Sequence, residues 1–559
     1  MNGHPVNATA SIYPTTTHDV TNQSGAFVGI NVYDNDAILR AAVEREGAGW
    51  VHERASRMGA HAADPEVQDH SHLANKHGPV LKTHDRFGNR IDFVEFHPSY
   101  HALMKLAFGS GVQSLAWTAG RPGGHVGRAA LSYLWNQVES GIGCPTGMAY
   151  SSVPTLRVVP EIDKVFTSKV LAEDYDLRPI HVGQKTAATI GMALTEKQGG
   201  SDLRANATRA VAVNGGGFGG EYRLTGHKWF CSAPMSDAFL TLAQTDKGPS
   251  LFFVPRSLPD GLRNRFFIQR LKNKAGNKSN ASSEIEYDDT YAILIGEEGR
   301  GIRGAMEMAH LTRLDFAIGS AGLMRWALNL TLHHTYNRRT FQRVLAEQPL
   351  MRNVLADLCL ESEAATMLAF RLGKHIDEAA TSEKHKLLER IVTPFAKFWN
   401  CKRAPIFVAE ALECHGGNGF IEEQPMPRIY REAPLNGIWE GTGNMICLDV
   451  MRAIEREPET VDALLAELGS AKGADLRYDR FVARLADDIA DVADRQVRMR
   501  QIVVGMATAY EAMLFLQHST HEAADAFIAS RLDGLANRAF GSLPRSTNFE
   551  AIVERSRLA

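Results

Sequence analysis

The chain has 559 residues and nearly balanced charge, with 61 Lys and Arg against 64 Asp and Glu and a formal net charge of −3. This length allows several domains and a large buried core. The charge balance provides no overall attraction to nucleic acid or to an anionic membrane. The sequence contains no run of about 18 apolar residues, so we expect no membrane-spanning helix.

The cysteines and the amino-terminal residues indicate a cytoplasmic protein. Residues 1–23 lack the basic start and the apolar centre of a signal peptide. The six cysteines are scattered without a CxxC pair, which favours reduced thiols over disulfides or a zinc site. They are Cys144, Cys231, Cys359, Cys401, Cys414 and Cys447.

Four histidines lie close together in the sequence, at His61, His70, His72 and His77. Their spacing matches no HExxH-type helical metal site. We therefore expect solvated loop histidines here and no metal ion.

The spacing of apolar residues divides the first half of the chain, residues 1–298, into three regions. Residues 1–35 predict an extended arm, and residues 36–190 are mostly helical in pattern, as in Tyr100–Phe108, where apolar residues recur at three and four positions. Over residues 191–298, short apolar or alternating runs are separated by Gly and Asn turns, which predicts a small β-barrel or sandwich. These runs cover residues 221–225, 238–243, 250–254, 266–271 and 283–287.

Helical patterning then resumes and continues nearly to the end. Residues 299–456 predict an α bundle, and Glu457-Pro458-Glu459 marks the start of a helical extension over residues 457–559. Within the extension, Leu476–Arg500 predicts one amphipathic helix. The fold class is therefore α+β and multi-domain. Residues 400–412 and 445–455 are further amphipathic stretches.

The most informative residue is Glu440, a carboxylate between Trp439 and a Gly-Thr-Gly turn. Glycines let the backbone approach a ligand closely, and a carboxylate against aromatic rings is partly desolvated and becomes a stronger base. Such a base suits removal of a weakly acidic proton from carbon. Taken alone, a carboxylate beside a glycine turn is more often solvated or a helix cap.

Three further segments accompany Glu440. Leu194–Asp202 reads LTEKQGGSD, Gly226–Ser232 reads GHKWFCS, and Glu413–Phe420 reads ECHGGNGF. In this order the four motifs resemble the acyl-CoA dehydrogenase family of flavoproteins, from about Glu44 to Arg456. The resemblance implies a helix, sheet, helix arrangement and FAD as cofactor. No Rossmann GxGxxG follows a strand, so we expect no nicotinamide site.

The resemblance implies that one set of residues surrounds the flavin ring. Thr195–Ser201 is a hydroxyl- and glycine-rich loop that could hold the ring and pyrophosphate, and the strand from Phe230 would pack on the isoalloxazine. A tight turn followed by a buried aromatic strand would give the same pattern. The expected residues are Thr195, Gln198, Gly200, Ser201, Trp229, Phe230, Cys231, Ser232, Trp439, Gly441, Thr442 and Asn444.

A second set is expected to come from a neighbouring subunit, which implies a homo-oligomer, in this family a tetramer built as a dimer of dimers. Arg338 would bind the flavin pyrophosphate through its guanidinium fork. It would otherwise form a surface ion pair. Gln342 stands where the family has glycine, which puts the local backbone geometry in question. The set is Arg338, Phe341, Gln348, Gly416, Gly417 and Gly419.

The resemblance also assigns the reaction. A base removes the proton alpha to a thioester carbonyl while hydride leaves the beta carbon. The family places this base either at the position of Glu440 or on the helix holding Thr312. Because a threonine cannot serve as the base, Glu440 is the remaining candidate. Arg313 matches an arginine near the substrate, and a structural role fits it equally well.

Three functions stay open. The first is a working medium- or long-chain acyl-CoA dehydrogenase. The second, favoured by the motif spellings and the long extension, is a flavoprotein like the bacterial alkylation-response members of the family, which bind double-stranded DNA and turn over little acyl-CoA. The third is a structural or interaction protein stabilised by flavin.

DNA binding predicts a basic surface, but residues 460–559 hold twelve Lys and Arg against fourteen Asp and Glu. Several arginines of the predicted helix also have acidic residues at i,i+4 spacing, which is typical of solvated helix faces. The better phosphate candidates are Arg452, Arg456 and Arg531. The pairs at this spacing are Arg484/Asp488, Asp491/Arg495 and Asp494/Arg498.

Overall fold

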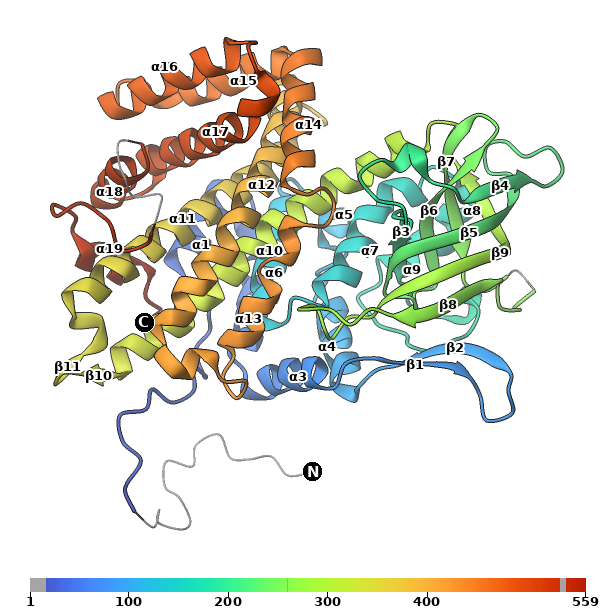
Figure 1. The fold of residues 1–559 in the computed structure, drawn as a ribbon, viewed down its shortest axis with the longest axis horizontal. Helices are drawn as coiled ribbons and strands as arrows, with labels where there is room; N and C mark the ends of the chain where they lie inside the picture. Colours follow the sequence, from blue (N-terminus) through green and yellow to red (C-terminus); the bar gives the residue numbers. More distant parts are fainter. Residues whose placement is uncertain (1–16, 259, 533–538, 559) are drawn as a thin grey trace.

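A computed structural model describes residues 17–258, 260–532 and 539–558, so the first part of the predicted arm lies outside the described residues. In the sequence, helical regions precede and follow one strand-rich region. In space, the strand-rich region forms one end of an elongated molecule (Figure 1). In the described part of the chain, none of the helices has the length and apolar character needed to cross a bilayer.

The amino-terminal region is mostly helical, as predicted, and Tyr100–Phe108 lies inside a helix. It also contains a hairpin that the sequence analysis missed, formed by β1 (Val80–His84) and β2 (Arg90–Glu95). Asp92 is fully buried in this hairpin and pairs with Arg90 and Arg263, so its charge is compensated. The helices are α1 (Ala37–Arg45), α2 (His52–Ala62), α3 (Pro65–Lys76), α4 (Pro98–Gly109), α5 (Leu115–Thr118), α6 (Gly124–Val138), α7 (Gly143–Leu156), α8 (Pro160–Ile162) and α9 (Ser168–Val170).

The middle of the chain forms a closed sheet. The strands run in the order β3-β6-β4-β5-β9-β7, β8 pairs with β9, and β7 also pairs with β6, which closes the ring into a small barrel. All five runs predicted as strands are strands, and Tyr222, Phe239 and Phe252 fill the interior. The strands are β3 (Ile190–Ala193), β4 (Arg209–Ala212), β5 (Glu221–Ser232), β6 (Ala238–Thr245), β7 (Gly248–Pro255), β8 (Phe266–Leu271) and β9 (Ser282–Ile295).

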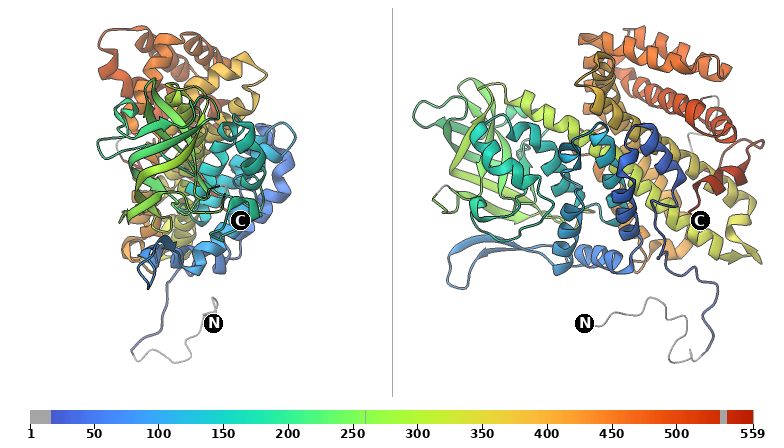
Figure 2. Two further views of the ribbon diagram at one scale, coloured as in Figure 1. Left: turned by 90° about the vertical axis from the view of Figure 1, so that its right-hand side faces the viewer. Right: turned by 180° about the vertical axis from the view of Figure 1, so that it is seen from behind.

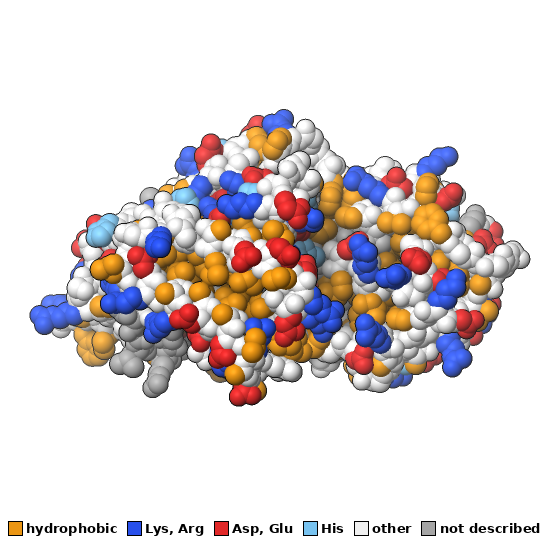
Figure 3. All heavy atoms as spheres, turned by 90° about the horizontal axis from the view of Figure 1, so that it is seen from above, with side chains coloured by type: hydrophobic (Ala, Val, Ile, Leu, Met, Phe, Trp, Pro, Cys, Tyr) orange, Lys and Arg blue, Asp and Glu red, His pale blue; other side chains and the backbone are white. Residues whose placement is uncertain are grey.

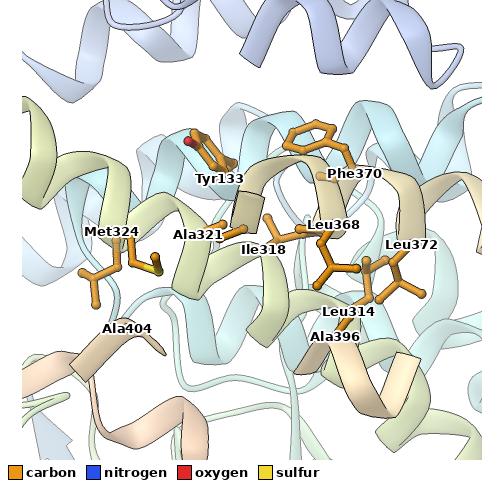
Figure 4. Close-up of a cluster of buried hydrophobic side chains, with 14 of the residues drawn as sticks. Tyr133, Leu314, Ile318, Ala321, Met324, Leu368, Phe370, Leu372, Ala396 and Ala404 are labelled. Carbon is orange, nitrogen blue, oxygen red and sulfur yellow. The ribbon is translucent and has the colours of Figure 1, made fainter. Parts of the chain in front are cut away.

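Three long helices form the bundle that follows: α10 (Gly301–Asn337), α11 (Pro349–Glu378) and α12 (Glu383–Cys414). Their apolar side chains interdigitate with those of α6, as Tyr133, Ile318 and Leu368 do in Figure 4. Burial of this apolar surface is the main stabilising term for the region. Two shorter helices complete it, α13 (Met426–Glu432) and α14 (Gly443–Arg456).

The extension packs on the bundle as further helices (Figure 2). Its buried side chains join the same hydrophobic cluster as those of the bundle, and charged contacts cross the boundary as well. Trp399 of α12, for example, donates its ring N–H to Glu511 at 2.9 Å. The extension consists of α15 (Glu459–Leu468), α16 (Leu476–Ala490), α17 (Arg495–His518), α18 (His521–Arg531) and α19 (Phe549–Ser556).

The prediction of one helix over Leu476–Arg500 is wrong, because α16 ends at Ala490 and α17 begins at Arg495. Asp494 has a left-handed backbone with φ 47°, and Arg498 donates to the carbonyl oxygens of Asp491 and Ala493 at 2.8 and 2.9 Å. The arginine thus satisfies carbonyls that the break leaves unpaired. The arginines also pair differently from the i,i+4 prediction: Arg498 contacts Asp488 and Asp491, and Arg495 contacts Glu455.

The six cysteines are buried free thiols, as expected. The four histidines were expected in loops, but His61, His70 and His72 lie on α2 and α3, and His77 caps α3. Among the described residues, no group of three or more His, Cys, Asp and Glu side chains could hold a metal ion.

Candidate active site

Glu440 lies where the sheet meets the two helical regions. Its neighbour Trp439 packs against a small cluster formed by Cys144 and Met148 of α7, Met192 of β3, and Ala233 just after β5. The backbone of Glu440 is left-handed, with φ 52°, and a non-glycine residue holds this conformation only at a cost. The glycine turn therefore places this carboxylate at the junction through a strained backbone.

Two buried cationic side chains, Lys397 and Arg313, bind the backbone of the Glu440 loop. The Lys397 ammonium donates to the carbonyl oxygens of Trp439 and Gly441, at 3.0 and 2.6 Å. Arg313 donates from Nε to the carbonyl oxygen of Glu440 at 3.3 Å. Burial raises the pKa of the Glu440 carboxyl above its usual value, and Arg313 and Lys397 oppose that rise. A carboxylate with a raised pKa is a stronger base when it is deprotonated.

Arg313 is oriented by a carboxylate of its own. Its guanidinium donates to Asp449 of α14 at 2.6 Å, and Arg390 donates to the other oxygen of Asp449 at 3.2 Å. Only 5% of Arg313 is exposed. Arg313 thus positions the Glu440 loop through its contact with the Glu440 backbone. Thr312 is buried beside it and donates to Ala309 of its own helix.

The Thr195 loop is tied to β5 by a buried ion pair. Glu196 and Lys228 meet at 2.7 Å with neither side chain exposed, and the Trp229 N–H donates to the Thr195 carbonyl oxygen at 2.8 Å. The amide of Gln198 is used within the loop, where it donates to Glu196. Glu196 and Lys228 carried no role in the sequence analysis, although both lie inside the quoted motifs.

The end of β5 presents an aromatic surface. Phe230 is 48% exposed, and the Lys272 ammonium lies 2.9 Å from the centre of the partly exposed Trp229 ring. Cys231 points the other way and is fully buried in the barrel interior, so only its backbone can face a ligand. Ser232 follows on the partly exposed side.

These residues fit a flavin ring. A Cβ added at Gly200 would lie 2.4 Å from Thr195 Oγ1, so glycine is needed to keep that hydroxyl in place. Gly199 has φ +148° and open space beside it, and Ser201 is exposed. The aromatic end of the strand provides a flat apolar surface. Exposed hydroxyls and glycine N–H groups form a polar rim around it.

The second expected set lies at the opposite end of the molecule, on the hairpin of β10 (Arg339–Thr340) and β11 (Arg343–Val344) (Figure 1). Phe341 and Gln342 form its two-residue turn with φ 48° and 66°, as a type I′ turn requires. Gln342 therefore adopts the left-handed backbone that favours glycine. Phe341 is 93% exposed at the tip. The hairpin and the barrel lie at opposite ends of the chain's fold (Figure 1).

The remaining predicted residues surround this hairpin and the 416–420 turn. Gln348 donates from its amide to Thr340 at 3.0 Å and so fixes the hairpin. Gly416 has φ +60°, and a Cβ added at Gly416 or Gly417 would meet open space. A Cβ at Gly419 would lie 2.2 Å from the Leu412 carbonyl oxygen, so this glycine is required by packing.

A narrow cavity of about 20 Å³ lies beside the Glu440 loop, with room for about one water. Phe316 and Trp439 stack across it with ring centres 4.7 Å apart. The buried carboxyl of Glu432 also lines it. The full lining is Asn136, Ser140, Gly143, Asp315, Phe316, Gly319, Leu323, Glu432, Leu435, Asn436 and Trp439.

The arginines predicted to contact DNA differ in exposure. Arg452 and Arg456 are exposed on α14, and neither forms an ion pair with the described residues. The prediction for Arg531 is wrong. Its side chain is buried and pairs with Asp357 at 2.6 Å and Glu361 at 2.9 Å, both on α11. Its partners lie about 170 positions earlier in the chain, so the local sequence could not show them.

Comparison with known proteins identifies the family of the chain. Residues 191–290 match the acyl-CoA dehydrogenase middle domain, and residues 299–455 match the acyl-CoA dehydrogenase C-terminal domain. The chain belongs to the acyl-CoA dehydrogenase family. Within it, residues 22–177 match the adaptive response protein AidB N-terminal domain. The chain is 44% identical over 480 residues to the putative acyl-CoA dehydrogenase AidB of Escherichia coli, covering 86% of this chain and 88% of that protein.

Two solved structures share the fold. ACDH-11 of Caenorhabditis elegans, in complex with C11-CoA, has a TM-score of 0.83 at 24% identity, covering 94% of both chains. An acyl-CoA dehydrogenase of Bacillus anthracis, complexed with FAD, has a TM-score of 0.68 at 17% identity, covering 95% of this chain and 91% of that one.

Proposed function

We propose that the protein is a cytoplasmic FAD-containing flavoprotein that binds double-stranded DNA in the response to alkylation damage and has at most weak acyl-CoA dehydrogenase activity. The flavin assignment rests on two exposed surfaces that could bind a ligand and lie apart in one chain. They are the aromatic end of β5 and the Phe341 hairpin. The B. anthracis relative was solved with FAD, which supports the choice of cofactor.

The two surfaces support an assembly in which each flavin lies between subunits. One subunit supplies the Thr195 loop and Phe230, and its neighbour supplies Arg338 and Phe341. A homotetramer arranged as a dimer of dimers provides such interfaces with closed symmetry. Burial of Phe341 on assembly would also remove a large exposed apolar side chain from water.

In this assembly Glu440 is the base for acyl-CoA chemistry. Its carboxylate removes the proton alpha to the thioester carbonyl, while Lys397 and Arg313 hold the loop so that the strained backbone keeps the carboxylate in place. The bound flavin would supply the hydride acceptor at N5. The apolar cluster around Trp439 lies next to the base and desolvates it in part.

The assignment of weak turnover follows the resemblance to the alkylation-response members of the family. The small cavity lined by Phe316 and Trp439 has room for about one water and carries no evidence about an acyl channel. An active dehydrogenase without DNA binding remains the second candidate, because every part of the Glu440 loop is in place.

The AidB relationship and the exposed arginines on α14 support the DNA assignment. Positive and negative side chains are interspersed over the face in Figure 3, and hydrophobic side chains gather beside them. A single subunit therefore has little net attraction for phosphate on this face. We propose that the DNA surface forms when α14 helices of several subunits come together in the assembly.

One experiment separates the candidates. The purified flavoprotein is titrated with a panel of acyl-CoA thioesters while flavin bleaching is followed, and duplex DNA binding is measured by gel shift at two salt concentrations. A salt-sensitive shift without bleaching supports the proposal. Bleaching without a shift supports the dehydrogenase. Neither response points to a structural flavoprotein.

A second experiment tests the cofactor site. Arg338→Gln should lower FAD content and subunit association together, because binding and assembly are linked. FAD content is read from absorbance and assembly from sedimentation. A well-behaved monomer that retains one FAD per chain would overturn the interface assignment.

A further inference from the structure

The segment Asn22–Phe27 lies against both elements of the second flavin set. Asn22 contacts the Phe341 hairpin twice through its side chain: Nδ2 donates to the Arg339 carbonyl oxygen at 2.9 Å, and the Arg339 N–H donates to Oδ1 at 2.8 Å. The Arg338 guanidinium donates to the backbone carbonyl oxygen of Asn22. One residue of the arm thus fixes both the strand and the side chain of the phosphate-binding arginine.

The following residues secure this position. Gln23 accepts from the amide of Asn418, in the glycine turn, at 3.4 Å. His333 donates to the Ser24 carbonyl oxygen at 2.9 Å. Phe27 packs edge-on against Trp326 with ring centres 5.6 Å apart.

The backbone of Asn22 shows that this contact is specific. Asn22 has φ 58° in the left-handed region, where Asn is tolerated better than most side chains. The residue is otherwise exposed. Two hydrogen bonds to Arg339 of the hairpin and one from Arg338 thus hold this exposed residue in the left-handed conformation.

We propose that residues 22–27 form a brace that positions Arg338 and the 416–419 turn for the adenosine and pyrophosphate half of FAD. This inference rests on the proposed function. The brace joins two elements that lie about 80 positions apart in the chain and must act on one ligand. By holding Arg338 in a fixed orientation, it reduces the entropy lost when the guanidinium binds a phosphate.

The test compares FAD release from purified holoprotein. The variants are Asn22→Ala, Asn22→Gly, Arg338→Gln and, as a matched control, Thr21→Ala, which alters the exposed neighbouring residue. FAD release on dilution is followed by the rise of flavin fluorescence, and melting of the flavin-free protein reports on folding.

We expect Asn22→Ala to speed FAD release about ten-fold, as loss of two neutral hydrogen bonds predicts. Asn22→Gly keeps the left-handed backbone and the carbonyl that accepts from Arg338, so its release should be intermediate. Thr21→Ala should match wild type. Melting of the flavin-free protein should change little, because an exposed arm opens locally before the protein unfolds globally. A merely structural role would instead lower the melting temperature together with the faster release.

The other outcomes overturn the brace in distinguishable ways. If Asn22→Ala releases FAD at the wild-type rate while Arg338→Gln releases it faster, the brace is wrong and the flavin interface stands. Slower release from Asn22→Ala would mean that the arm competes with FAD. If Arg338→Gln also behaves as wild type, or if wild type carries no FAD, the interface assignment fails together with the brace.

Discussion

The Lys228 ammonium and the Glu196 carboxylate form an ion pair at 2.7 Å in which neither side chain reaches solvent. The carboxylate also accepts from the N–H groups of Ala207 and Thr208, and the ammonium donates to the Leu242 carbonyl oxygen. Removing one partner of such a pair leaves an unpaired charge in the barrel. Lys228→Met should therefore destabilise the protein by about 3–5 kcal/mol, whereas an exposed substitution such as Lys197→Met should have little effect.

The dependence of protein stability on pH provides a second test of the Glu196–Lys228 ion pair. Burial by itself raises the pKa of the Glu196 carboxyl. The neighbouring Lys228 and the hydrogen bonds outweigh this effect and lower the pKa to about 2. A carboxyl with a lowered folded pKa stabilises the protein above its unfolded pKa, and this contribution is lost as the pH falls toward 2. Glu196→Gln should flatten that acid loss in thermal melts. Equal acid sensitivity in the variant would contradict the assignment.

Glu440→Gln should abolish any acyl-CoA dehydrogenation while leaving the flavin spectrum nearly unchanged. The amide keeps the shape of the side chain and removes the base, a loss of about 10²–10⁴-fold. In wild type, burial raises the pKa of Glu440, so turnover should fall as the pH drops through a value above that of an ordinary glutamate. Stopped-flow bleaching across pH measures both effects, and undiminished turnover in the variant would exclude Glu440 as the base.

Glu432 should make the stability of the protein depend on pH in the direction opposite to that of Glu196. Burial, and then the neighbouring Glu139, raise the pKa of Glu432 to about 7. The protonated form is favoured in the folded state, so stability is highest below the unfolded pKa and is lost as the pH rises toward 7. A pKa raised from 4.5 to about 7 corresponds to about 3 kcal/mol. Glu432→Gln should therefore stabilise the protein at pH 8 and change little at pH 4.

Gln at position 432 can still accept the Asn277 N–H that now reaches Glu432 at 2.7 Å, so the comparison isolates the charge. Thermal melts at the two pH values provide the measurement. The same stability change at both would show that Glu432 is already ionised or already neutral throughout.

Exchanging Arg452 and Arg456 for Gln should weaken duplex binding for all sequences alike. Each lost phosphate contact should flatten the slope of log affinity against log salt by about one. Arg477 is a matched control on the extension, because it is already paired with Asp475 and Asp525 at 2.6 Å. Fluorescence anisotropy with labelled duplex measures the slopes, and an unchanged slope in the double variant would remove α14 from the interface.

Much of the fold could be predicted because its signals are local. The alternating runs of the barrel and the three- and four-residue spacing of helices such as α4 follow from which face each element buries. The glycines also predict a turn beside Glu440, but the left-handed backbone of Glu440 itself appears only in the structure. The β1–β2 hairpin was missed because its strands lie mostly on the surface and carry little apolar alternation.

The errors have two causes. The break between α16 and α17 is local: residues 491–494 leave the helical conformation and Asp494 has a left-handed backbone, although the segment contains no glycine or proline to indicate it. Arg531 looked unpaired because Asp357 and Glu361 are remote in the sequence. The roles of Lys397 and Asp449 likewise appear only once α10, α12 and α14 are packed together.

The carboxylates along α11 give the extension a role in charge balance. Asp357, Glu361 and Glu363 are all buried, and Asp357 and Glu361 repel each other at i,i+4 spacing. Arginines from the extension neutralise them, Arg531 for the first two and Arg555 for the third. The extension thus supplies the positive charges that neutralise buried carboxylates of the bundle. A chain that ended after α14 would leave Asp357 and Glu363 without these arginines, while Glu361 would keep its pair with Arg403 of α12. The bundle of such a chain would be most at risk at neutral pH and low salt.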